Sequence, residues 1–262
     1  MQPDVERLPA PTMGVIYICT GEKYIRAGMS SARTVRKWCP GLPVHLFADW
    51  PRHAFQFDVD PGPFTSVTAI EASHRMPKVD YMSQSPYDWT LYLDTDTALR
   101  ADIRGVFRLL ERFDIAMAHA HHRHGRRKPM ALSVGLPLAF PDYNTGVIVF
   151  RKSDATLRLL TQWQSEFHRY VDEARNDQIA MRHSVWSSDV RVATLPPEYN
   201  VRYLKYHLLW SKTEAATKIF HLRLYHVGWY AWLFRPLAKM QMRIERRVRA
   251  EGLAGLLRGR RR

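Results

Sequence analysis

Residues 91–97 read LYLDTDT, an apolar run that ends in two aspartates separated by one threonine. Two carboxylates at the end of a buried strand repel each other and lose solvation, so they need a positive charge between them. Residues i and i+2 of an extended chain point the same way, and Asp94 and Asp96 are therefore expected to face one divalent cation. Two solvated acids that simply end a strand are the structural alternative, because an Asp-x-Asp pattern alone has little specificity.

Strands and helices alternate along the chain around this motif. A β-branched apolar run at 13–19 is followed by a helical segment at 22–38, and further strands are predicted at 43–48, 66–70 and 89–93. This alternation predicts an α/β fold with a mostly parallel, Rossmann-like central sheet and helices on both faces. Ligands bind such sheets at the carboxyl ends of the strands, where the two aspartates lie. The remaining predicted elements are helices at 74–84, 103–112, 153–172 and 177–183, a polar loop at 119–128, and strands at 115–118, 147–150, 190–195 and 218–221.

Positive charge is concentrated at the end of the chain. The 262 residues carry a formal net charge of +14, but residues 223–262 hold ten Arg and one Lys against two Glu, a net of +9 that leaves +5 for the rest. A basic anion- or nucleic-acid-binding protein, the main alternative class, would spread its charge over the whole body. Nucleic acid is therefore not the expected partner, and the basic end needs a separate explanation.

The cysteines and the N-terminus indicate the compartment. Cys19 and Cys39 are the only cysteines, too few for a disulfide framework, which favours a reducing cytosol. The N-terminal MQPDVERLPAPT lacks the basic and apolar segments of a signal peptide. No apolar run approaches the roughly 20 residues of a membrane span. We expect a cytoplasmic protein, soluble or peripheral on the inner face of the membrane.

Four further motifs follow the DTD triplet in order. They are YNTGVIVF at 143–150, NDQ at 176–178, LPPEYN at 195–200 and IFH at 219–221. The series resembles the nucleotide-diphospho-sugar glycosyltransferases of the GT-A fold, most closely the retaining glycogenin- and galactosyltransferase-like (family 8-like) group. The resemblance implies a GT-A catalytic domain over residues 1–222, followed by an aromatic and basic helical extension at 223–262.

The same resemblance implies an activity. It is metal-dependent transfer of a sugar from a nucleotide-diphosphate donor, a UDP-sugar or similar, to a saccharide or lipid-linked acceptor, with retention at the anomeric carbon. Asp94, Asp96 and His221 would hold Mn²⁺ or Mg²⁺, ions that suit oxygen ligands, with His226 as the reserve ligand. Asp177 and Gln178 would face the sugar as catalytic residues. Further donor and acceptor contacts would come from Tyr17, Thr20, Tyr24, Arg75, Lys78, Asn144, Thr145 and Gly146.

Structural roles also explain several of these residues. A histidine at a strand end is often a satisfied structural residue, and Asn-Thr-Gly also suits a turn before a strand. Asn176 is a possible helix cap, and Arg75 and Lys78 are possible solvated charges. Thr20 stands where the family often has an aspartate, which leaves base specificity open.

A phosphatase of the haloacid-dehalogenase type is a second alternative for the DTD motif. Such enzymes carry D-x-D-x-T/V after an apolar strand, and Asp94 would be the nucleophile. The fifth position here is Ala98, and the motif lies far from the start of the chain, so this alternative is disfavoured.

The basic extension has an amphipathic pattern. Leu237, Met240, Ile244 and Val248 fall on one face of a helix predicted within residues 228–257, with basic residues around them and aromatic residues upstream. This pattern favours binding to an anionic membrane surface. A helix that packs its apolar stripe on the catalytic domain is the alternative.

Overall fold

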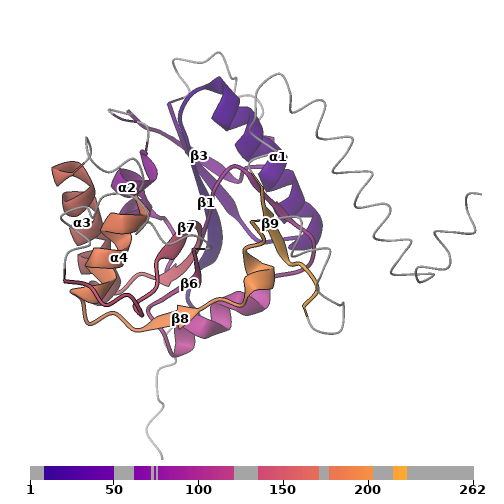
Figure 1. Cartoon of the computed structure of the whole chain (residues 1–262). Helices are drawn as coiled ribbons and strands as arrows, with labels where there is room; N and C mark the ends of the chain where they lie inside the picture. The colour runs from indigo at the N-terminus through magenta and orange to yellow at the C-terminus, as the bar shows by residue number, and fades with distance from the viewer. Residues whose placement is uncertain are drawn as a thin grey trace, which may run out of the picture.

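The computed structural model describes residues 9–49, 62–71, 74, 76–120, 135–170, 177–202 and 215–222, and it shows one central sheet flanked by helices (Figure 1). Several predictions lie outside these residues. They concern Arg75, Asn176, His226, most of the polar loop at 119–128 and the extension at 223–262.

The main sheet has seven strands and a second, small sheet has two. The main strands are β1 Met13–Cys19, β2 Val44–Ala48, β3 Ser66–Ala69, β4 Trp89–Leu93, β6 Ile115–His119, β7 Tyr143–Arg151 and β8 Val192–Thr194, in the order β3-β2-β1-β4-β7-β6-β8. The small sheet pairs β5 Thr97–Leu99 with β9 Ile219–His221 in antiparallel fashion. In the main sheet β7 runs antiparallel to both neighbours, while the other pairs are parallel, so the mostly parallel α/β prediction is confirmed.

Helices cover both faces of the sheet, as predicted. On one side lie α1 Glu22–Trp38 and the 3₁₀ helix η3 Arg104–Glu111; on the other lie α2 Lys78–Tyr81, η2 Met82–Gln84, α3 Asp154–Arg169 and α4 Gln178–Trp186 (Figure 1). Strands β1 and β4 are buried on both faces, which explains their continuous apolar sequences. Ser153 caps the N-terminus of helix α3, where its side chain accepts a hydrogen bond from the Thr156 amide. Among the described helices, none is both long and apolar enough to cross a membrane.

Three local predictions need correction. The helix expected at 103–112 is a 3₁₀ helix, and the one expected at 74–84 divides into α2 and η2. Strand β7 begins at Tyr143 rather than at 147, because Tyr143 and Asn144 pair with the end of β6. The Asn-Thr-Gly motif therefore belongs to a strand and is not a turn before one.

The reversed strand β7 brings two distant motifs together. Leu93, the last residue of β4, pairs with Val147, and the Asp94 amide donates to the Gly146 carbonyl at 2.8 Å. Because β7 is antiparallel, its first residues lie at the same edge as the last residues of β1 and β4. The Asn-Thr-Gly and DTD motifs consequently share the ligand-binding edge of the sheet.

Candidate functional site

The two aspartates lie in a tight turn that joins β4 to β5. The Thr97 amide and hydroxyl both donate to the Asp94 carbonyl, at 3.1 and 2.8 Å. The expectation of an extended Asp-Thr-Asp stretch is therefore wrong, because this i to i+3 bond closes a turn. The turn still brings the two side chains together, and Asp96 is almost completely buried.

A histidine completes a group of three possible ligands. His221 Nε2 lies 3.0 Å from Asp96 Oδ1 and 3.4 Å from Asp94 Oδ2. The pairing of β9 with β5 positions it, since His221 is opposite Thr97 and the Leu222 amide donates to the Asp96 carbonyl. One ligand atom from each of the three residues lies within 4.8 Å of the others.

Gly146 has no side chain, which lets His221 and Asp94 approach each other against its backbone. A β-carbon at this position would overlap the His221 ring and the Asp94 carboxylate. Two carboxylates and an imidazole packed against backbone form a donor set that suits a divalent cation such as Mn²⁺ or Mg²⁺. The residues present therefore fit the expected ion.

Lys78 supplies the positive charge next to Asp94. Its Nζ lies 3.4 Å from Asp94 Oδ1 and 3.2 Å from both the carbonyl and the hydroxyl oxygen of Thr145. Asp177 Oδ2 is 3.2 Å away, an ion pair without hydrogen-bond geometry. Burial favours the neutral amine, but the carboxylates of Asp177 and Asp94 outweigh it and raise the pKa of Lys78 above its ordinary value. Lys78 is thus a buried cation at the site.

Tyr92 contacts the same aspartate. Burial and the Asp94 carboxylate raise the pKa of Tyr92 well above its ordinary value, so its hydroxyl keeps its proton and donates to Asp94 Oδ1 at 2.6 Å. Burial also opposes ionisation of Asp94, yet Lys78 and His221 hold the pKa of that carboxyl well below its usual range. Asp94 is ionised at neutral pH.

The predicted residues at the end of β1 differ in their surroundings. Tyr17 is 0% exposed and lies in the core, where its hydroxyl is 2.7 Å from Ser31 Oγ. Ser31 Oγ is in turn 2.8 Å from Thr97 Oγ1, so hydrogen bonds link the Tyr17 hydroxyl through Ser31 to the residue that closes the turn. Thr20 is half-buried, and Tyr24 is 46% exposed in the first turn of α1. Of these three side chains, Tyr24 offers the most surface to a ligand.

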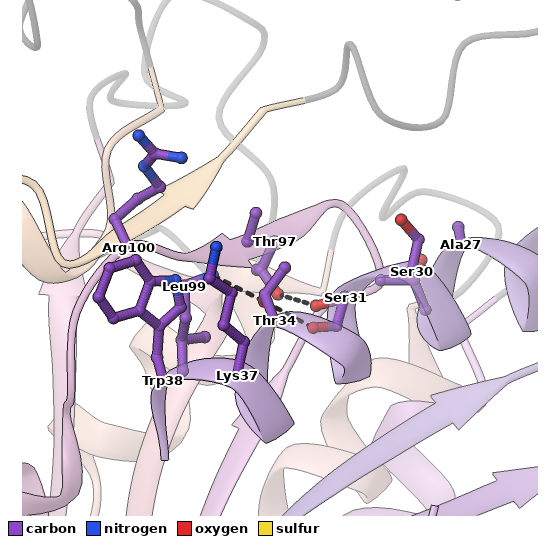
Figure 2. A pocket seen from close by; sticks show the side chains of 11 residues that line it. Ala27, Ser30, Ser31, Thr34, Lys37, Trp38, Thr97, Leu99 and Arg100 are labelled. Carbon is purple, nitrogen blue, oxygen red and sulfur yellow. Dashed lines mark hydrogen bonds between the residues drawn. The ribbon is translucent and has the colours of Figure 1, made fainter. Parts of the chain in front are cut away.

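A pocket of ≈190 Å³ lies on the α1 side of the turn, with Thr95 and Thr97 in its lining (Figure 2). Ser31, Thr34 and Thr97, which have hydroxyl groups, are among the residues that line it. These are bonded within the protein, since Thr34 Oγ1 donates to the Ser31 carbonyl and accepts from the Leu99 amide. The hydroxyls therefore support the turn.

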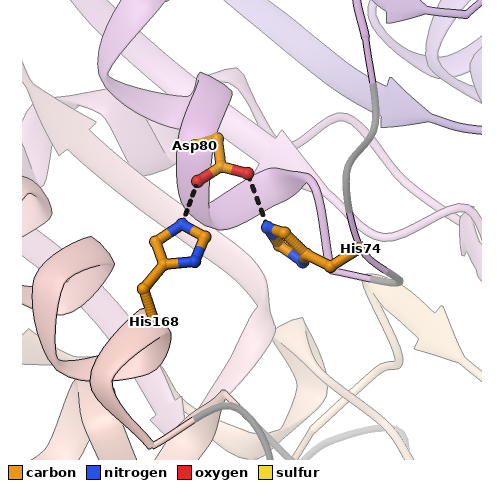
Figure 3. A group of neighbouring side chains, drawn as sticks. All are labelled: His74, Asp80 and His168. Atoms are coloured by element: carbon orange, nitrogen blue, oxygen red, sulfur yellow. Dashed lines mark hydrogen bonds and ion pairs between the residues drawn. The ribbon is translucent and has the colours of Figure 1, made fainter.

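A second group of possible metal ligands consists of His74, Asp80 and His168 (Figure 3). Each histidine Nε2 lies 2.6 Å from a different Asp80 oxygen. The Met76 amide donates to His74 Nδ1, so the proton of neutral His74 is on Nε2. A cation at Nε2 would move that proton to Nδ1, where it would oppose the Met76 N–H. We therefore interpret the group as a clasp that holds α2, the helix of Lys78, against α3.

Three residues near the ligand group were not assigned a role from sequence. Tyr92 could have been found, because it precedes Asp94 by two residues and points to the same face. Asn200 is part of the quoted LPPEYN motif, and its amide donates to Asn144 Oδ1 at 2.9 Å. Arg202, whose Nη1 lies 2.7 Å from His221 Nε2, has no sequence signal.

Comparison with known families now adds to this geometry. A family model described as nucleotide-diphospho-sugar transferase matches residues 59–227. The chain belongs to this family. The transferase is therefore an enzyme of the predicted glycosyltransferase class, and neither the phosphatase nor the nucleic-acid-binding alternative is favoured. No curated protein matches the chain.

Solved structures of glycosyltransferases share the fold of this nucleotide-diphospho-sugar transferase. The galactosyltransferase LgtC, in complex with donor and acceptor sugar analogs, superposes with a TM-score of 0.59 at 12% identity over 87% of this chain and 95% of its own. GlyE of Streptococcus pneumoniae gives 0.54 at 15% identity over 80% of this chain and 54% of its own. Mouse xyloside xylosyltransferase 1 gives 0.52 at 13% identity over 80% and 97%. These similarities confirm the GT-A fold.

Proposed function

We propose that this transferase moves a sugar from a UDP-sugar or similar donor to a saccharide or lipid-linked acceptor, with Mn²⁺ or Mg²⁺ bound by Asp94, Asp96 and His221. The observation that carries the proposal is the closed group of two carboxylates and one imidazole, opposite a glycine that leaves no space for a side chain. The bound cation would supply electrostatic stabilisation of charge on the departing diphosphate.

We assign different roles to the side chains next to the three proposed ligands. Lys78 is a fixed cation that holds Asp94 ionised and oriented toward the ligand group. Asp177 lies beyond it, immediately before α4, and Gln178 is the first residue of that helix. We assign the donor sugar to this side, with retention at its anomeric carbon. One LgtC structure is of an active-site mutant in which glutamate replaces a glutamine, which supports a place in the active site for Gln178 here.

A donor screen tests the activity. UDP-, GDP-, CMP- and TDP-sugars are incubated with the enzyme, with and without Mn²⁺, and nucleotide release is followed. We expect turnover of at least one donor, dependent on the metal, and its loss in Asp96→Asn. Asp102→Asn removes an exposed carboxylate outside the site and is the matched control. Activity that survives chelation, or that survives in Asp96→Asn, contradicts the metal-dependent mechanism.

We further propose that the basic extension places the enzyme on the inner face of the membrane, close to lipid-linked acceptors. The support is the amphipathic pattern of Leu237, Met240, Ile244 and Val248 within a segment of net +9. Flotation on anionic vesicles tests it: the full-length chain should float, and Ile244→Asp should remain in the soluble fraction. Equal behaviour of the two proteins excludes the apolar stripe as an anchor.

A further inference from the structure

We propose that Asn200 is a positioning residue that holds His221 in the tautomer with its proton on Nδ1. In the neutral ring, Nε2 then presents a lone pair to the space between Asp94 and Asp96. This inference deepens the metal-dependent function proposed above and rests on it. Neutral imidazole can carry its proton on either nitrogen, and only one of the two forms can bind a cation through Nε2.

The tautomer follows from a chain of hydrogen bonds that begins at a donor of fixed identity. The Gly146 backbone N–H donates to the side-chain atom of Asn144 at 3.1 Å, so that atom is the amide oxygen. The atom of Asn200 that lies 2.9 Å from this oxygen must then be the amide nitrogen. The oxygen of Asn200 consequently faces His221 Nδ1 at 2.8 Å, and Nδ1 must be the protonated nitrogen.

The opposite side of the ring has contacts of both kinds. Arg202 Nη1 lies 2.7 Å from His221 Nε2. A guanidinium group has only donors and remains protonated in proteins. A lone pair on Nε2 suits this contact, whereas the oxygens of Asp96 and Asp94, 3.0 and 3.4 Å from the same nitrogen, favour a proton there. The tautomer is therefore assigned from the Nδ1 side of the ring.

Burial makes the selection effective. Asn144, Asn200 and His221 are 4%, 2% and 1% exposed, so water has little access to either ring nitrogen. Without its asparagine partner, Nδ1–H would be a buried donor without an acceptor, while Nε2–H could donate to the nearby carboxylates. Removal of Asn200 should thus move the proton to the nitrogen that the cation needs.

The experiment compares Asn200→Leu with Asn200→Asp. Leucine removes the acceptor for Nδ1–H, whereas aspartate keeps an acceptor, loses the amide donor to Asn144 and adds a negative charge. Thr90→Val removes a buried hydroxyl bonded to Ser85 at the other end of β4 and is the control. Long-range ¹H–¹⁵N spectra of the metal-free proteins identify the protonated nitrogen of His221, and calorimetric titration with Mn²⁺ gives the affinity.

The pH of the spectra matters. Burial lowers the pKa of His221, but the carboxylates of Asp96 and Asp94 outweigh burial and raise it above its ordinary value. Spectra are therefore recorded at about pH 9, well above the ordinary pKa of histidine.

We expect Nδ1–H in the wild type, in Asn200→Asp and in Thr90→Val, and loss of that state in Asn200→Leu. The Mn²⁺ affinity of Asn200→Leu should fall roughly 10- to 100-fold. Nε2–H in the wild type, or an unchanged tautomer in Asn200→Leu, overturns the proposal. If Asn200→Leu does not fold, Nε2–H in the wild type still overturns the proposal. If wild-type protein shows Nδ1–H but binds no Mn²⁺, the proposed metal dependence fails and the tautomer assignment stands.

Discussion

At the scale of single residues, the site depends on how closely side chains approach one backbone position. Gly146 has an ordinary backbone conformation and does not occupy the left-handed region. Its requirement is therefore steric: a methyl group would be 2.5 Å from Asp94 Oδ2 and would also overlap the His221 ring. Two of the three proposed ligands would have to move to accept it.

Gly146→Ala tests this requirement. We expect activity to fall on the order of 100-fold, because ligand displacement of about 1 Å is costly in a preorganised site. Mn²⁺ affinity, measured by calorimetry, should fall as well. Gly105→Ala is the control, since a methyl group there meets no atom within 4 Å. Equal activity of the two variants would show that the ligands tolerate displacement.

At the scale of elements, the short helix α2 carries Lys78 into the site, and a separate clasp holds it. Asp80, two residues further on, accepts hydrogen bonds from Gln164 and, in the clasp, from His74 and His168. A four-residue helix is not stable by itself, so its position must come from such tertiary contacts.

Asp80→Ala should affect both stability and catalysis. Loss of the clasp and of the Gln164 bond should lower the free energy of unfolding by about 1–2 kcal/mol. kcat/KM should also decrease, because α2 no longer holds Lys78 firmly. Denaturant unfolding and steady-state kinetics measure the two effects, with Asp154→Ala on the exposed side of α3 as the control. A loss of stability without any kinetic change would show that Lys78 is held by its own contacts alone.

The sequence predicted some elements well and others poorly, for physical reasons. The apolar run at 13–19 and the helical pattern at 22–38 match β1 and α1, because each buries a continuous face. Strand β5 has three residues, too few to show a period. The hydrogen bonds of Asn144 and Asn200 could not be predicted from the sequence either. They depend on the direction of β7, which no local sequence pattern encodes. Ordered motifs could still identify Asp94, Asp96 and His221 as neighbours.

At the scale of the whole molecule, the carboxyl ends of the parallel strands and their amino ends have different roles. The candidate site lies at the carboxyl ends of β1 and β4. At the opposite end of the sheet, Asp114 links the strands β6, β7 and β8. It accepts hydrogen bonds from Arg151 at the end of β7 and from Arg191 before β8. Burial raises the pKa of Asp114, but the bonds from Arg191 and Arg151 outweigh burial and lower it to about 2.

Asp114→Asn should therefore reduce stability and leave kcat/KM unchanged. A carboxyl with a lowered folded pKa stabilises the protein above its unfolded pKa of about 4, and this contribution is lost as pH falls toward 2. We expect a loss on the order of 2 kcal/mol at pH 7 that shrinks as the pH falls through this range. Urea unfolding at several pH values measures it. A pH-independent difference would assign the effect to packing.

The reversed direction of β7 also affects how the enzyme can change during evolution. Strand β6 ends at the ligand edge and β7 begins there, and the Ala120 amide donates to the Asp142 carbonyl at 2.7 Å. The connection between these two residues thus leaves and re-enters the sheet at one place, at the same end of the strands as the proposed ligand group. Pro137 and Phe140, in its described part, accept hydrogen bonds from Arg182 of α4, so this part is fixed to the fold. Natural selection, or a designer grafting loops, can insert residues before this fixed part and leave the ligand group intact.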